Sequence, residues 1–209
     1  MYKYHKSRES RHRRVPAKGD LVRDRILSAA LRLFRKKGYL GTSMTEIADA
    51  VHLTKGGIYH YIGKKEDLLR ELHDAMIDAV DDRYQDSVEP EPDPGKKLVN
   101  WITIHASIMH DYLDQIAVFF TEIEHLDKKT LKRMIERRDE VHRRLADIIR
   151  MGVDLGNFRK GMDPDIAAFL ILGTLNWFYQ WYRPSGKRSL EEITNMTIHM
   201  VCHGVCVGP

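Results

Sequence analysis

Apolar residues recur at every third or fourth position along most of this 209-residue chain. That period is typical of amphipathic α-helices, and no stretch shows the strict alternation of a half-buried strand. Glycines, prolines and capping residues divide the pattern into segments. We therefore predict an all-α fold of about nine helices, the longer ones covering residues 21–37, 66–87, 95–112, 116–125, 127–155, 164–183 and 189–204.

A shorter pattern lies between the first two of these helices. Residues 42–62 contain two apolar faces that are separated by the three residues 52–54. Ser43 and Glu46 have the spacing of a capping box, and Thr54 is suited to cap the second segment. Two short helices joined by a tight turn predict a helix-turn-helix, in which the second helix enters the major groove of DNA.

The second short helix has the chemistry of a nucleic-acid contact. Its two adjacent glycines each cost about 1 kcal/mol relative to alanine inside a helix, but they let the backbone approach DNA closely. Hydroxyl, imidazole and ammonium groups around them can donate hydrogen bonds, mostly to phosphates. Taken singly, these residues fit core packing or a solvated face equally well; in this order they favour DNA. The predicted contact set is Thr42, Thr54, Lys55, Gly56, Gly57, Tyr59, His60, Tyr61 and Lys65.

The charge distribution supports a polyanion-binding front end. The net charge is +4 for the whole chain, to which residues 1–20 contribute +5, residues 21–69 contribute +4 and residues 70–209 contribute −5. A basic module joined to an acidic body is typical of nucleic-acid-binding proteins, although charge alone fits an incidental basic tail equally well. We predict a disordered basic arm at residues 1–19 that adds phosphate or minor-groove contacts.

The segment TSMTEIADAVHLTKGGIYHYIGKKEDLL, residues 42–69, resembles the DNA-binding signature of TetR-type bacterial transcription regulators. The resemblance implies an all-α homodimer with an N-terminal DNA-binding domain and a variable C-terminal domain that holds a small effector. Two departures from the family pattern are His52, where glycine is usual, and Ile62-Gly63, where Phe-Pro is usual. By position, the resemblance implies DNA contacts at Thr42, Lys55, Gly56, Tyr59, Tyr61 and Lys65.

The body of the chain is predicted to bind an effector and to dimerise. Residues 164–183 and 189–205 are assigned to the homodimer interface, because a helix that is apolar nearly all round must be buried on both sides; a core helix of a monomer is the alternative. Residues 175–193 resemble, more loosely, the TetR-type regulators of fatty-acid and sterol breakdown, which respond to acyl-CoA thioesters. The predicted effector set, for which ordinary core packing is the alternative, is Trp101, Met109, Phe119, Phe120, Arg137, Arg138, Trp177 and Trp181.

These observations predict three segments: the arm 1–19, a helix-turn-helix DNA-binding domain 20–65, and an effector-binding and dimerisation domain 66–209. The predicted function is that of a ligand-responsive transcription regulator, a repressor released from double-stranded operator DNA by a small apolar or acyl-CoA-type effector. The alternative is a helical small-molecule- or metal-binding protein without specific DNA recognition. No phosphate loop, GxSxG or HExxH motif is present, and neither an enzyme nor a cofactor is expected.

The last features of the sequence concern metal binding, cellular location and membrane insertion. His199, Cys202, His203 and Cys206 share one helical face and suit zinc or copper, yet a single helix rarely supplies four ligands, so no metal site is predicted. Two cysteines in the whole chain indicate a reducing, cytoplasmic location. The most apolar run, residues 166–179, is shorter than the roughly 20 residues that span a bilayer.

Overall fold

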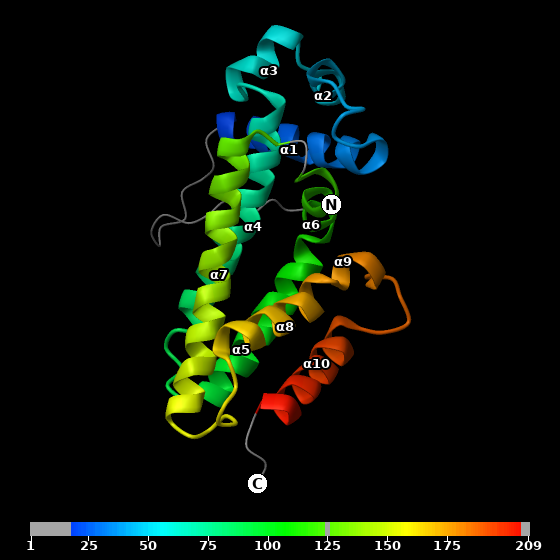
Figure 1. The fold of residues 1–209 in the computed structure, drawn as a ribbon. Coiled ribbons are helices and arrows are strands. Elements are labelled where there is room, and N and C mark those ends of the chain that lie inside the picture. The colour runs from blue at the N-terminus through cyan, green and yellow to red at the C-terminus, as the bar shows by residue number, and fades with distance from the viewer. Residues whose placement is uncertain (1–17, 124–125, 206–209) are drawn as a thin grey trace. The chain divides into compact units, whose positions relative to one another are not determined.

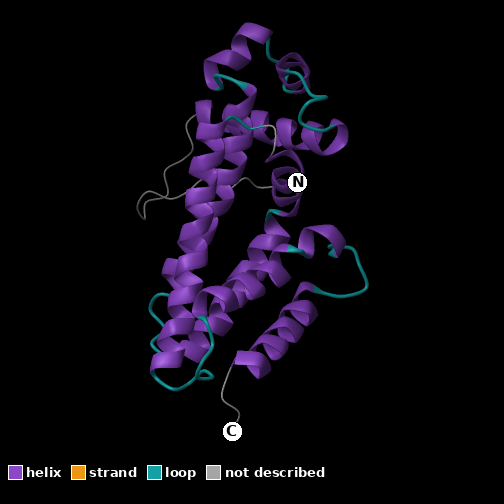
Figure 2. Cartoon of the chain, viewed as in Figure 1, coloured by secondary structure: helices purple, strands orange, loops and turns teal. Residues whose placement is uncertain are grey.

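The structure is a computed structural model that describes residues 18–123 and 126–205 (Figure 1). Within these ranges the chain forms helices and no β-strand, as Figure 2 shows, which confirms the all-α prediction. The helices are α1 (Lys18–Lys37), α2 (Met44–Ala50), α3 (Lys55–Tyr61), α4 (Lys65–Ser87), α5 (Pro94–Asp111), α6 (Leu113–Glu122), α7 (Lys128–Asp154), α8 (Pro164–Asn176), α9 (Phe178–Trp181) and α10 (Leu190–Val205). Nine of these have seven or more residues, and α9 is a single four-residue turn.

The chain divides into two compact units. The first comprises residues up to Asp78 together with Asp114–Met134, so it contains α1, α2, α3 and the first part of α4, with α6 and the start of α7. Helices α1, α2 and α3 contact one another in it. Its core is formed by apolar side chains that are almost fully buried, among them Ile26, Phe34, Ile47, Ile58, Leu68, Phe119 and Met134.

The second unit comprises Ala79–Leu113 and the residues from Ile135 onward. Helix α5 is at its centre, because it contacts both α8 and α10. The helix begins at Asp93-Pro94, where the Asp93 carboxylate accepts a hydrogen bond from the Lys96 amide at 2.8 Å. Its buried residues include Trp101, Ile102, His105, Ile108 and Met109.

Most predicted helix ends are confirmed by their capping contacts. Ser43 and Glu46 form the capping box of α2, and Thr54 caps α3. Asp163 caps α8 by accepting from the amides of Asp165 and Ile166 at 2.9 and 3.0 Å. Helix α1 begins at Lys18, and Asp20 lies in its first turn.

The prediction of one continuous helix over residues 164–183 is wrong. Helix α8 ends at Asn176, Trp177 forms its C-cap, and the four-residue α9 follows. Trp177, Phe178 and Trp181 continue the apolar pattern through the break, so hydrophobic periodicity alone gave no sign of it.

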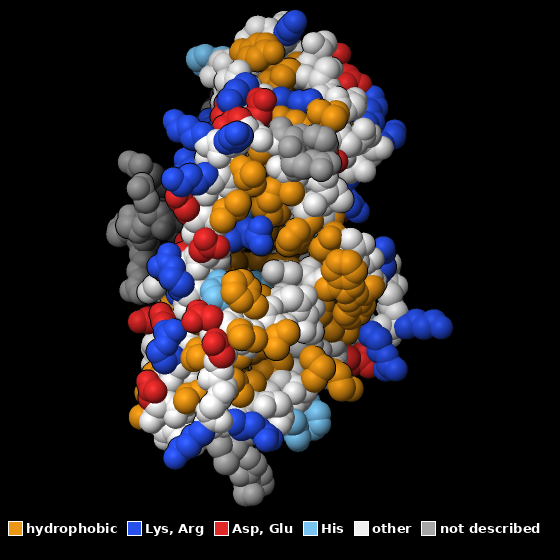
Figure 3. All heavy atoms as spheres, in the orientation of Figure 1, with side chains coloured by type: hydrophobic (Ala, Val, Ile, Leu, Met, Phe, Trp, Pro, Cys, Tyr) orange, Lys and Arg blue, Asp and Glu red, His pale blue; other side chains and the backbone are white. Residues whose placement is uncertain are grey.

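Apolar side chains remain uncovered on α8, α9 and α10, as the orange surface over these helices in Figure 3 shows. Each of the following is exposed by half or more: Ile166, Phe169, Leu170, Trp177, Trp181, Met196 and Met200. We call this set the α8–α10 apolar face. Among the described residues no helix is both long and apolar enough to cross a membrane.

Candidate nucleic-acid interface

The turn between α2 and α3 is fixed by short-range hydrogen bonds. His52 has a φ of +59°, the left-handed conformation that glycine adopts most easily, at the position where the family pattern has glycine. The Leu53 amide donates to the Ala48 carbonyl at 2.9 Å. Arg25 of α1 donates to the Val51 carbonyl at 3.0 Å. Contacts with α2 and α1 therefore hold the turn although it lacks the usual glycine.

Helix α3 is anchored on one side and exposed on the other. Ile58 and the following Ile62 are buried in the core of the first unit, at 0% and 1% exposure. Thr54, in an extended conformation before the helix, accepts a hydrogen bond from the Gly57 amide at 3.0 Å. The exposed side of the helix presents Lys55, Gly56, Tyr59 and His60, whereas Gly57 and Tyr61 are half-buried. This face offers an ammonium, a phenol and an imidazole beside bare backbone.

Thr42 and Lys65 differ from the rest of the predicted contact set. Thr42 is buried, and its hydroxyl donates to the Gly38 carbonyl at 2.9 Å. The Lys65 ammonium donates to the carbonyls of Tyr39 and Thr42 at 2.8 and 2.9 Å and lies 4.2 Å from the centre of the Tyr39 ring. Both side chains therefore tie the loop before α2 to the start of α4, and neither presents a wholly free donor to a ligand.

The start of α2 carries a second set of charged contacts. Glu46 accepts hydrogen bonds from the Ser43 amide at 2.9 Å and from the Lys37 ammonium. These contacts, the one with Lys37 foremost, lower the pKa of Glu46 from 4.5 to about 2. The carboxylate stays ionised at any physiological pH and holds the end of α1 against α2.

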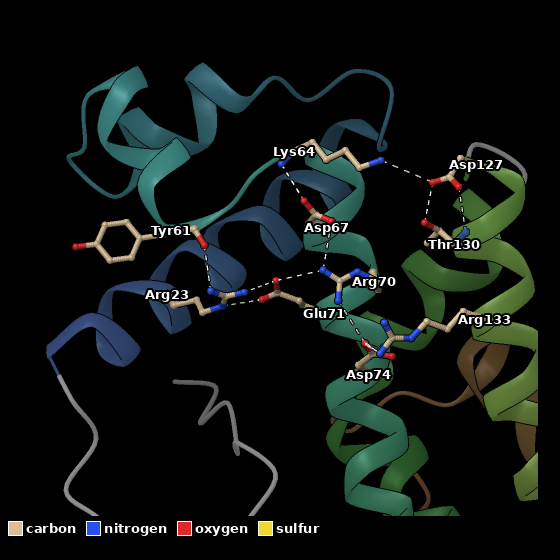
Figure 4. Close-up of polar contacts among 10 residues, drawn as sticks. All are labelled: Arg23, Tyr61, Lys64, Asp67, Arg70, Glu71, Asp74, Asp127, Thr130 and Arg133. Atoms are coloured by element: carbon tan, nitrogen blue, oxygen red, sulfur yellow. Dashed lines mark hydrogen bonds and ion pairs between the residues drawn. The ribbon is translucent and has the colours of Figure 1, made fainter.

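An ionic network connects the end of α3 with α1, α4 and the start of α7 (Figure 4). Arg23 of α1 donates to the Tyr61 carbonyl at 3.0 Å and forms a bidentate pair with Glu71 of α4. Arg70 lies 3.7 Å from Glu71 and 3.6 Å from Asp74. Asp74 in turn pairs with Arg133 of α7 at 3.5 Å. We call this set the α3–α7 ionic network.

A second link of the same kind lies beside this network. Lys64, just after α3, pairs with Asp127 at 3.8 Å, and its amide donates to Asp67 at 3.0 Å. Neither link could be predicted from the sequence, because partners such as Arg23 and Glu71 are 48 residues apart. The only sequence signal was an unusual density of acids and bases at residues 64–74.

The residues predicted to bind an effector belong to different parts of the fold. Trp101 and Met109 are buried in the second unit, whereas Phe119 belongs to the core of the first. Trp177 and Trp181 are 58% and 50% exposed and belong to the α8–α10 apolar face. The predicted set is therefore distributed among two cores and an outer surface.

The predicted phosphate-binding arginines already have acidic neighbours. Arg137 and Arg144 both pair with Asp81 of α4, at 3.3 and 2.6 Å. Arg138 is half-buried, and this burial lowers its pKa below the ordinary arginine value, against an opposing effect of Asp139. A phosphate that used Arg137 would have to displace or share the Asp81 carboxylate.

His199 and His203 lie together on α10, but the described residues do not form a metal-binding cluster around them. The rings of His199 and His203 lie 3.9 Å apart, and His203 Nδ1 donates to the His199 carbonyl at 2.8 Å. Within residues 18–123 and 126–205 no group of three or more His, Cys, Asp or Glu side chains is placed to hold an ion. Cys206, the fourth residue of that constellation, lies outside the described residues, as does the arm up to residue 17.

A capped helix-turn-helix with an exposed, donor-rich second helix, followed by a larger helical body, defines the class of one-component DNA-binding regulators. Residues 26–72 match the family model described as "Bacterial regulatory proteins, tetR family". Residues 91–205 match the model described as "Tetracyclin repressor-like, C-terminal domain". The chain belongs to the TetR family of bacterial transcriptional regulators, and this confirms the resemblance seen in the sequence.

Relatives of this chain are regulators rather than enzymes. The HTH-type transcriptional repressor KstR2 of Mycobacterium tuberculosis is 25% identical over 193 residues, which cover 92% of this chain and 96% of the relative. Its fold, described as that of a ketosteroid transcriptional regulator, matches with a TM-score of 0.82 over 93% of this chain and 98% of KstR2, at 22% identity.

Two further solved structures are similar over most of this chain. The TetR family regulator PfmR from Thermus thermophilus has a TM-score of 0.80 and 30% identity, covering 86% of this chain and 98% of PfmR. AibR, solved in complex with isovaleryl coenzyme A and operator DNA, has a TM-score of 0.76 and 27% identity, covering 86% of this chain and 97% of AibR.

Proposed function

We propose that this protein represses transcription by binding an operator as a homodimer, and that a small acyl-type effector releases it. The single observation that carries the proposal is the exposed face of α3, where Lys55, Gly56 and Tyr59 stand on a helix anchored from behind by Ile58. Side-chain and backbone donors of such a helix set its register on phosphates and bring a few groups to base edges. A cytoplasmic location goes with this function.

Dimerisation is supported by the α8–α10 apolar face. Its exposed residues on α8 follow helical spacing, from Ile166 through Phe169 and Leu170 to Trp177, and Met196 and Met200 are one turn apart on α10. An exposed apolar surface of this kind marks an interaction site. A second copy is the proposed occupant, because operator half-sites are read by two recognition helices in symmetric pairs.

The effector class is supported by the relatives. AibR was solved with isovaleryl coenzyme A, and KstR2 is described as a ketosteroid regulator, so both names point to acyl or steroid chemistry. In this chain α5 carries buried aromatic and apolar side chains, among them Trp101 and Met109, which are suited to contact an apolar chain. Arg137 and Arg138 remain the proposed partners for coenzyme phosphates.

Release from DNA requires an effector that binds one state of the body better than the other. The proposed path runs along α4 to α3, because Glu71 of α4 holds Arg23, which in turn holds the last turn of α3 at the Tyr61 carbonyl. A small movement of α4 would therefore shift or release the recognition helix. The proposed functional boundaries are a DNA-binding domain over residues 20–65 and an effector and dimer domain over residues 66–209.

A mobility-shift titration of the full chain with the DNA upstream of its own gene tests the proposal. We expect a specific shift at about 50 mM salt that weakens by orders of magnitude at about 200 mM, because phosphate contacts release counterions. Lys55→Ala and Tyr59→Phe should each weaken the shift. The absence of any shift at low salt would favour a helical small-molecule-binding protein with an incidental basic front.

A further inference from the structure

His105 is a buried imidazole with one ring nitrogen that has no partner. The residue is 4% exposed on α5, and its Nε2 lies 3.1 Å from Oδ1 of Asn176 on α8. Nδ1 is buried and has no hydrogen-bond partner among the described residues. Natural proteins leave few buried polar atoms in this condition, and those that occur are often functional.

The unpartnered nitrogen is an acceptor. Because Oδ1 of Asn176 can only accept, the shared proton belongs to His105 Nε2, and a neutral ring then offers only a lone pair at Nδ1. Burial lowers the pKa of His105 to about 4, against the raising effect of the Asn176 hydrogen bond. The ring is therefore neutral near pH 7, and Nδ1 can accept a hydrogen bond but cannot donate one.

The surroundings of this acceptor on α5 are apolar. The neighbours at helical spacing are Trp101, Ile102, Ile108 and Met109, all buried. Trp101 stacks on the imidazole with ring centres 4.6 Å apart and an interplanar angle of 13°. A buried water needs two or more polar partners, which these side chains do not supply. An apolar molecule that carries a single hydroxyl is the better match.

We propose that His105 determines effector specificity by accepting, at Nδ1, a hydrogen bond from a hydroxyl group on an otherwise apolar acyl effector. The inference rests on the proposed function, since it assumes an acyl effector in the second unit. We therefore expect hydroxylated acyl thioesters to bind more tightly than saturated thioesters of equal length. Through Asn176 the contact also reaches α8, the helix that exposes Phe169 and Leu170.

Equilibrium binding of the full chain to three probes tests this assignment. The probes are decanoyl-CoA and its 3-hydroxy and 10-hydroxy derivatives, measured by calorimetry. We expect one hydroxylated probe to bind about tenfold more tightly than decanoyl-CoA, the fold-change of one hydrogen bond made in a buried site. His105→Gln keeps an N–H donor for Asn176, and its remaining acceptor, the amide oxygen, no longer stands at the position of Nδ1, so the preference should fall to within about twofold.

His110→Gln is the matched control. His110 is also an imidazole of α5, but its Nδ1 already has the Tyr182 hydroxyl as a partner, at 2.7 Å. This variant should retain the tenfold preference. If His105→Gln does not fold, the ¹⁵N resonance of His105 Nδ1 in the wild type provides the readout, because it should shift with the hydroxylated probe and not with decanoyl-CoA.

Equal affinities of the wild type for all three probes would overturn the role of His105 and leave the proposed effector class standing. A preference that persists in His105→Gln, or an unmoved Nδ1 resonance, would overturn it as well. Binding of none of the thioesters by a protein that still shifts DNA would instead overturn the acyl-CoA class itself, and this inference with it.

Discussion

Gly56 and Gly57 are adjacent in α3, but the protein itself requires only one of them. A Cβ on Gly57 would lie 3.1 Å from the Thr54 hydroxyl oxygen that caps the helix, tighter than ordinary contact. A Cβ on Gly56 would meet no atom within 4 Å. The missing side chain at Gly56 is therefore not explained by the packing of the chain, and close approach of DNA is the explanation that we favour.

Gly56→Ala should change stability and DNA binding in opposite directions. Alanine is the better helix former, so the free energy of unfolding should rise by a few tenths to about 1 kcal/mol. Operator affinity should fall at least tenfold, because the added methyl group intrudes on the DNA. Gln85→Ala is the control: it places the same methyl side chain at an exposed position of α4, outside the helix-turn-helix and the segments assigned to the dimer interface, and should leave operator affinity unchanged. Unfolding curves and fluorescence anisotropy measure the two quantities.

Glu46 gives the protein a component of acid sensitivity. Its pKa is lowered to about 2 in the folded chain from 4.5 in the unfolded one, chiefly by Lys37. The folded state therefore gains stability above pH 4.5 and loses it as the pH falls from about 5 towards 2. Glu46→Gln should flatten this part of a plot of melting temperature against pH. An unchanged slope in Glu46→Gln would contradict the assignment.

At the scale of elements, contacts between residues close in sequence were predictable, whereas contacts between distant residues were not. Capping at Ser43 and Thr54 was predicted because each cap is a contact between residues three positions apart. The start of α5 at Asp93-Pro94 has the same Asp-Pro pattern as the start of α8 at Asp163-Pro164.

The burial of Thr42 and the internal bonds of Lys65 could not be predicted in the same way. These contacts depend on the loop before α2 folding back over the start of α4, a juxtaposition of residues 23 to 26 positions apart. The same holds for the aromatic residues of the body. Phe119 and Trp181 have similar apolar character in the sequence, yet one is core and the other is half exposed.

Glu71→Gln tests whether the α3–α7 ionic network positions the recognition helix. Glu71 lies on α4, outside the helix-turn-helix, and its carboxylate holds Arg23 in a bidentate pair. Its neutralisation should lower stability by about 1 kcal/mol and weaken operator binding several-fold through a loosened α3. The control is Asp147→Asn, which removes an exposed pair with Arg150 on α7, outside the segments assigned to the dimer interface, and should change neither quantity. Wild-type operator affinity in Glu71→Gln would show that the network is structural only.

At the scale of the whole molecule, the proposed dimer interface and the proposed operator binding both require two copies of the chain. The α8–α10 apolar face is buried only if a partner covers it, and the paired half-sites of an operator need two copies of α3. If the proposed homodimer forms through this face, operator binding depends on it.

Leu170→Glu should disrupt the dimer. Leu170 is 69% exposed at the α8–α10 apolar face, and a carboxylate there would be desolvated in an apolar contact. We expect a monomer by sedimentation and a loss of operator affinity on the order of 100-fold, because the second half-site is no longer engaged. Leu155→Glu is the control, because Leu155 is 65% exposed but lies outside this face. A dimeric Leu170→Glu variant would place the interface elsewhere.

The most direct measurement is a dimethyl sulfate protection footprint of the wild-type protein on its own upstream DNA, since the reagent reports on guanine N7 in the major groove. The central claim predicts two protected patches centred about one helical turn apart or a multiple of it. It also predicts that Gly56→Ala weakens both patches together. Tight binding that leaves every guanine N7 reactive, or protection indifferent to Gly56→Ala, would contradict the claim that α3 lies in the major groove.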